Sequence, residues 1–138
     1  EELGALTEDP SAPVRARALQ ALAQVAHRGD AWALRAASAR LDDCEEQVAH
    51  AAQHALLHLA ERGDPCALEA VAVHFDDPHW RVRESALLAY VQLSDDEERV
   101  VATSRAFLDD PDPRVRDAAS MAISNRESLL ELCQFKMR

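Results

Sequence analysis

Apolar residues recur along the chain with the spacing of amphipathic helices, and the same pattern is repeated several times. An aspartate precedes each pattern, at Asp9, Asp43, Asp77 and Asp110, and a valine follows five residues later each time. Small or apolar residues then stand four, seven and eight positions after that valine, on one face of a helix with 3.6 residues per turn. The aspartates are separated by 34, 34 and 33 residues, so the chain is built from repeats.

Each repeat is predicted to hold two helices. The first, which we name the A helix, is predicted at 13–28, 46–61, 79–93 and 113–125. The second, the B helix, is predicted at 31–41, 65–75 and 97–108, with a shortened fourth member at 128–137. Gly29 and Gly63 are expected to end A helices in the left-handed conformation, and Asp30 and Asp64 to cap the following B helices. The predicted core positions of the B helices are Leu34, Ala37, Leu41, Leu68, Val71, Phe75, Val101, Ser104 and Leu108.

These elements predict an all-α fold, an α-solenoid of about four stacked antiparallel helix pairs. The repeats fall at about 8–41, 42–75, 76–108 and 109–138, within one solenoid segment spanning 1–138. Residues 2–6 resemble the tail of a preceding B helix, and 129–137 are apolar, so neither end has the polar outer face of a capping repeat. We therefore expect a piece of a longer array whose ends can self-associate end to end.

The repeat also carries a short motif, Asp-x4-Val-Arg, that is typical of a known family. It begins at Asp9, Asp77 and Asp110, and the segment 108–119 holds it in its fullest form. The motif resembles the HEAT repeat, in the short form of the bilin (phycobilisome) lyase group, over residues 8–125. Tetratricopeptide and ankyrin repeats have similar periods, but their signature residues are not found in this chain.

The resemblance implies a ladder of ion pairs between successive repeats. In such repeats the motif aspartate of one unit pairs with the motif arginine of its neighbour, which implicates Asp9, Arg15, Asp77, Arg83, Asp110 and Arg116. A carboxylate at a helix start can cap free N–H groups and also bind a guanidinium. The second repeat departs from the motif, because Ala49 stands at the arginine position and Cys44 at that of the following proline.

Composition narrows the class of partner. The chain has 15 basic and 25 acidic residues, a net charge of -10, which weighs against nucleic acid as the partner. It has no apolar run of the roughly 20 residues that cross a bilayer, and its acidic first eight residues predict no signal peptide. Cys44, Cys66 and Cys133 are too few and too far apart for a disulfide framework. We expect buried free thiols and a cytoplasmic, reducing location.

One residue pattern raises the question of metal binding. His50, His54 and His58 lie one helical turn apart and form a single stripe on the side of their helix opposite the apolar face. We expect a solvated surface, with weak zinc or nickel binding as the alternative. The His-Glu dyads of deoxyhypusine hydroxylase, a di-iron HEAT protein, are missing, since Ala51 follows His50. We expect no catalytic residue, no resident metal and no cofactor.

The outward side of the B helices is the predicted working surface, because it combines small residues with one tryptophan and several charges. In HEAT-type solenoids this side is concave and can accept a helix or an extended peptide. The predicted contact residues are Trp32, Arg35, Ala36, Ala39, Arg40, Glu69, Val73, His74 and Arg99. The small residues can equally serve to let neighbouring units approach closely.

The sequence thus predicts a protein-interaction or scaffold module that is not an enzyme. A HEAT-repeat subunit of an enzyme such as a bilin lyase is the alternative.

Overall fold

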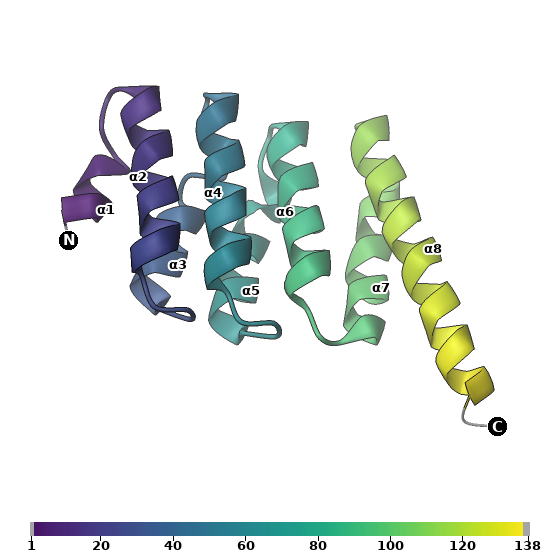
Figure 1. Cartoon of the computed structure of the whole chain (residues 1–138). Coiled ribbons are helices and arrows are strands. Elements are labelled where there is room, and N and C mark those ends of the chain that lie inside the picture. The colour runs from purple at the N-terminus through teal and green to yellow at the C-terminus, as the bar shows by residue number, and fades with distance from the viewer. Residues whose placement is uncertain (1, 137–138) are drawn as a thin grey trace.

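The computed structural model of the protein describes the backbone of residues 2–136 and the side chains of residues 3–127. The helices stand side by side in an elongated array, with the two ends of the chain at opposite ends of the molecule (Figure 1). The described residues contain no strand. The all-helical solenoid predicted from the sequence is confirmed.

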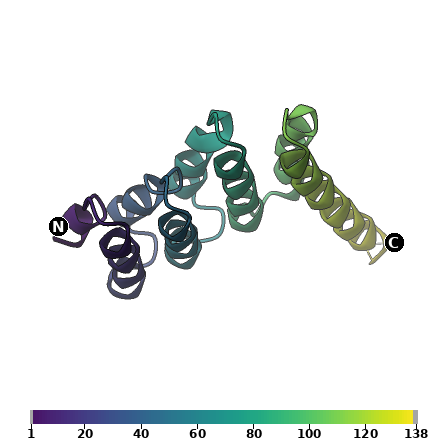
Figure 2. The same cartoon turned by 90° about the horizontal axis from the view of Figure 1, so that it is seen from above.

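The helices form two rows, which Figure 2 shows from above. The A helices are α2 (Ala12–Val25), α4 (Glu46–Leu59), α6 (Trp80–Leu93) and α8 (Pro113–Lys136). The B row holds α1 (Glu2–Leu6), α3 (Ala31–Ser38), α5 (Pro65–Ala72) and α7 (Glu97–Ala106). Short 3-10 helices, η1 (Val73–Asp76) and η2 (Phe107–Asp109), extend α5 and α7.

Small side chains allow the A helices to pack closely. Ala52, Ala55, Ala86 and Ala89 are completely buried, together with larger residues such as Leu56. One cluster of buried apolar residues runs from α2 to α6, and a second joins Leu87, Phe107, Val115 and Ala119 at the C-terminal end of the array. Because each unit buries its apolar face against its neighbours, stability depends on the contacts between repeats.

Backbone bonds link the repeats at the end of the A helices. Gly29 and Gly63, in the loops after α2 and α4, have φ angles of 85° and 83°, the left-handed region that glycine adopts readily. In this conformation the Gly29 N–H donates to the Leu59 carbonyl at 2.7 Å and the Gly63 N–H to the Leu93 carbonyl at 2.6 Å. Each of these glycines therefore binds the carbonyl of the last residue of the next A helix. Neither ends its own helix as predicted, because α2 already ends at Val25 and α4 at Leu59.

Arginine–aspartate pairs link repeats at the start of the A helices. Arg15 on α2 donates to both carboxylate oxygens of Asp43, at 3.0 and 3.1 Å. Arg83 on α6 donates to both oxygens of Asp110, at 2.8 and 2.9 Å. Each arginine also donates to the carbonyl of its own repeat's motif aspartate, and Arg116 donates to that of Asp110. We name the two bidentate pairs the ladder rungs.

The rungs keep their carboxylates ionised. The Arg83 hydrogen bonds, helped by the Asp112 amide, lower the pKa of Asp110 against the opposing effect of burial. Burial acts most strongly on the pKa of Asp43 and would raise it, but the bonds from Arg15 and the Glu45 amide together outweigh burial and lower it. All four motif aspartates accept the N–H two residues further on, which shapes the turn into the A helix.

Two details in the third and fourth repeats differ from the sequence-based prediction. The separate fourth B helix is wrong, because α8 continues without a break from Pro113 to Lys136. No glycine or proline interrupts it, and Arg126 fixes its middle by donating to the Val91 carbonyl and pairing with Glu97. Leu108, predicted in the core, is exposed, and Phe107 takes its place.

We expect Asp110→Asn to lower the free energy of unfolding by roughly 1–3 kcal/mol at pH 7, because the variant loses a charge-assisted bidentate pair. Asp9→Asn is the matched control, since Asp9 also accepts an amide in its turn but no arginine among the described residues reaches its carboxylate. Unfolding in urea measures the free energy of unfolding of both variants. Equal losses in the two variants would show that the rung contributes nothing beyond the turn.

The Arg83–Asp110 pair also predicts how the free energy of unfolding depends on pH. Because the pKa of Asp110 lies below its ordinary value of 3.8 in the folded state, its contribution is complete above about pH 4 and is lost as the pH falls through the lowered value. The difference between the wild-type protein and Asp110→Asn should therefore be constant from pH 7 to about 5 and shrink towards pH 3. A difference that stays constant to pH 3 contradicts this account.

Candidate functional site

The predicted contact residues of α3 lie together in a surface depression of about 420 Å³ between α1 and α3. Nine residues line it: Gly4, Ala5, Thr7, Glu8, Trp32, Arg35, Ala36, Ala39 and Arg40. The five of these that belong to α3 and the turn after it were all predicted from the sequence. The four that precede α2 were missed, because residues 2–6 were treated only as the tail of another helix.

Trp32 forms one wall of this depression and is 45% exposed. Its indole ring lies directly against Gly4, where a Cβ atom would overlap the ring atoms Cζ2 and Cη2. Gly4 is helical, so its glycine is explained by this close approach rather than by backbone conformation. Trp32 therefore attaches α1 to α3 with one part of its ring and leaves the other part accessible.

The other predicted contact residues lie further along the B row. Glu69 on α5 and Arg99 on α7 are exposed, and Val73 is 78% exposed. His74 is partly buried, and its Nε2 lies 2.8 Å from the Ser38 carbonyl oxygen. None of these four lines the depression beside α1, so the structure divides the predicted face into a pocket on α3 and a more open surface on α5 and α7.

The basic residues of this face are available to a partner to different degrees. Arg35 and Arg99 are exposed, and neither forms an ion pair with the residues that the structure describes. Arg40 is partly occupied, because its Nη1 lies 3.9 Å from an Asp43 oxygen. On a chain of net charge -10, the guanidinium group of Arg35, unpaired within the described residues and beside the exposed Trp32, is a distinctive local feature.

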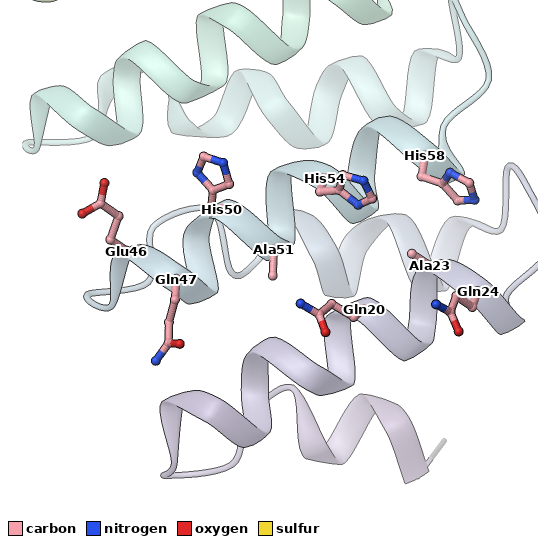
Figure 3. A pocket seen from close by; sticks show the side chains of 9 residues that line it. All are labelled: Gln20, Ala23, Gln24, Glu46, Gln47, His50, Ala51, His54 and His58. Carbon is pink, nitrogen blue, oxygen red and sulfur yellow. The ribbon is translucent and has the colours of Figure 1, made fainter.

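The histidine stripe lies on the other row, where it borders a groove of about 880 Å³ between α2 and α4. His50, His54 and His58 are exposed, as predicted, and the rings of His54 and His58 stack with centroids 6.3 Å apart. Figure 3 shows the three histidines along α4 and two glutamines, Gln20 and Gln24, on α2. The first and last histidines are separated by about 12 Å of helix rise, too far for all three rings to bind one ion.

The cysteine prediction was partly wrong. Cys44 is exposed, because it lies in the turn before α4 in place of the motif proline, and Cys66 is half-buried near the start of α5. The side chain of Cys133 lies outside the described residues.

Charged groups on α6 and α8 stabilise the C-terminal part of the array. The Arg114 guanidinium lies 3.5 Å above the centre of the Trp80 ring and also pairs with Asp112, which lowers the pKa of that carboxyl. Burial raises the pKa of Glu84, and the charge of Arg114 opposes this effect. The shifted pKa values of Asp112 and Glu84, which lie outside the ladder, are therefore explained by the contact with Arg114 and by burial between helices.

The two rows of helices, the repeat period and the motif turns are typical of helical repeat proteins. A comparison with family models identifies which family this is. The model for HEAT repeats matches residues 34–124. The chain belongs to the HEAT-repeat family. This match does not distinguish the bilin lyase type from other HEAT repeats. A separate comparison with curated proteins found no match. No helix within the described residues of this HEAT-repeat chain is long and apolar enough to cross a membrane.

We expect Gly4→Ala to displace the Trp32 ring from α1, because the added methyl group would occupy the space of the indole. Trp32 should then become more solvent-exposed and its fluorescence emission should shift to longer wavelength. The measurement uses a Trp80→Phe background so that Trp32 is the one emitting tryptophan. Ala5→Ser, also beside the depression, is the control, and an unchanged spectrum in Gly4→Ala would contradict the packing described here.

Proposed function

We propose that this chain is a protein-interaction module, not an enzyme, and that it binds a helix or an extended peptide along the outward side of its B row. HEAT repeats commonly serve as protein-interaction scaffolds. The observation that carries the proposal is the depression beside α3, in which a half-exposed tryptophan lies next to Arg35, an exposed arginine without an ion-pair partner among the described residues.

The composition of the depression suits a contact that contributes much of the binding energy. Tryptophan and arginine are the residue types most enriched among the energetically dominant positions of interfaces. The small side chains of Ala36 and Ala39 leave room for a partner's backbone to approach the surface. Trp32 is also held against Gly4, so less side-chain freedom is lost when a partner covers it.

The charges of the B row indicate what the partner carries. Arg35, Arg40 and Arg99 provide positive charge along the face, whereas Glu69 is acidic and lies between them in the repeat order. A partner with an apolar stripe flanked mainly by Asp or Glu complements this arrangement. Such a partner would be steered to the B row even though the chain as a whole is acidic.

The test compares one charge reversal on each row. Proteins captured from a cell lysate by the immobilised chain are identified, and the binding of the purified partner is then measured for Arg35→Glu and Arg17→Glu. Arg17 is the matched control, because it is exposed on α2 and has no ion pair among the described residues. We expect Arg35→Glu to weaken binding by about tenfold or more and Arg17→Glu to leave it within about twofold.

The location is tested independently by photo-crosslinking. A photoreactive residue at Ala39, in the B-row depression, should form a crosslink to the partner, whereas one at Gln24, in the groove of the A row, should not. Equal loss of binding in both arginine variants, or crosslinking only from Gln24, would place the contact elsewhere and overturn the proposal.

A further inference from the structure

The ladder lacks one rung, at the junction between the second and third repeats. Ala49 on α4 occupies the position that Arg15 and Arg83 hold in the neighbouring repeats. Its counterpart in the next repeat is Asp77, which corresponds to Asp43 and Asp110. The carboxylates of Asp43 and Asp110 each accept two hydrogen bonds from an arginine, but no arginine among the described residues bonds to the carboxylate of Asp77, since Arg83 donates only to its main-chain carbonyl.

The missing side chain leaves space and uncompensated charge. A cavity of about 310 Å³ lies at this junction and is lined by Ala49, Asp42, Asp43 and Asp77, among others. Arg81 also lines this cavity, but its guanidinium pairs with Glu46 at 3.7 Å. One oxygen of Asp77 accepts the His79 amide at 2.9 Å, which leaves its other oxygen open to a further partner.

Two more residues with metal-ligating atoms lie beside Asp77. One ligand atom each of Asp42, His74 and Asp77 lies within 4.8 Å of the others. Asp42 comes from the turn between α3 and α4, whereas His74 lies in η1 and Asp77 follows it. The group therefore joins two successive repeats, as a ladder rung does. We name these three residues the junction triad.

The position of His74 prepares it for a cation. Its Nε2 lies 2.8 Å from the Ser38 carbonyl oxygen, which can only accept a hydrogen bond, so Nε2 carries the proton. In the neutral ring, Nδ1 then has the free lone pair that a metal needs. Histidines that bind metals commonly donate their second N–H to a backbone carbonyl in this way, which fixes the tautomer and the orientation of the ring.

We propose that the junction triad binds a divalent transition-metal ion, with zinc as the ion of choice, and that this ion takes the place of the missing arginine. Two carboxylates and one imidazole are a ligand set that suits zinc, and water can complete the coordination. The bound ion neutralises the carboxylates of Asp42 and Asp77 and connects the turn after α3 with η1. Asp42 is exposed and accepts no hydrogen bond from the described residues, so its side chain can turn towards the ion.

The other junctions explain why the site is confined to this one. The position of His74 is occupied by Arg40 in the first repeat and by Phe107 in the third. Arg40 places its own positive charge 3.9 Å from Asp43, and Phe107 is buried in the core and offers no ligand. Only the junction without a ladder arginine has a histidine at this position.

The test is isothermal titration of zinc chloride into the metal-free chain at pH 7.5 with a reducing agent. The background carries His50→Gln, His54→Gln and His58→Gln, which removes the exposed stripe as a competing site. Asp42→Asn is the test variant, and it should fold normally because Asp42 is exposed. Asp109→Asn is the matched control, since Asp109 holds the equivalent exposed position two repeats further on and does not belong to the junction triad.

We expect one zinc ion per chain in the background protein, unchanged affinity in Asp109→Asn, and affinity lowered by about tenfold or more in Asp42→Asn. Zinc should also raise the melting temperature of the background protein and not that of Asp42→Asn. The proposal is overturned if the background protein binds no zinc, or if Asp42→Asn binds it as tightly as Asp109→Asn does.

Discussion

The bidentate contact between a motif arginine and the motif aspartate of the next repeat fixes how neighbouring repeats stack at two of the three junctions. Helices with small inner residues can slide past one another, because alanine surfaces have little shape to fix a register. Arg15–Asp43 and Arg83–Asp110 fix it with two directional hydrogen bonds each, near the start of the A helices. The glycine N–H bonds to Leu59 and Leu93 fix the other end. Within the described residues, both attachments occur together at the junction between the first and second repeats, whereas the second junction has the glycine bond and the third has the arginine pair.

The same constraint determines where a ligand can bind. Where a rung is complete, the aspartate is neutralised within the protein. Where Ala49 replaces the arginine, Asp77 lies beside Asp42 and His74, and this is the junction at which we propose a bound cation. The partner surface has a different origin, because it consists of B-row side chains that make few contacts within the array. Three of these residues also make internal contacts: Trp32 with Gly4, Arg40 with Asp43, and His74 with the Ser38 carbonyl.

Most of the fold could be predicted from the sequence, because period, apolar spacing and helix-ending residues all repeat. The first three A helices were predicted to within a few residues, and Gly29 and Gly63 adopt the expected left-handed conformation, although they lie beyond the helix ends. The prediction failed where a repeat is irregular: α8 has no breaking residue at its middle, and Phe107 replaces Leu108 by a shift of one position. The junction triad was missed because Asp42 precedes His74 by 32 positions and Asp77 by 35, so the three residues meet only when the repeats stack. The gap at Ala49 was visible in the sequence, but its consequence needed the neighbouring side chains.

The most direct test of this account is the thermal unfolding of Ala49→Arg with and without zinc. An arginine at this position has an aspartate in the next repeat to bind and a cavity of about 310 Å³ to enter. The account predicts that the metal-free variant melts at a higher temperature than the metal-free wild-type protein, and that zinc no longer raises its melting temperature. A variant that melts at the same or a lower temperature would contradict the central role of the ladder.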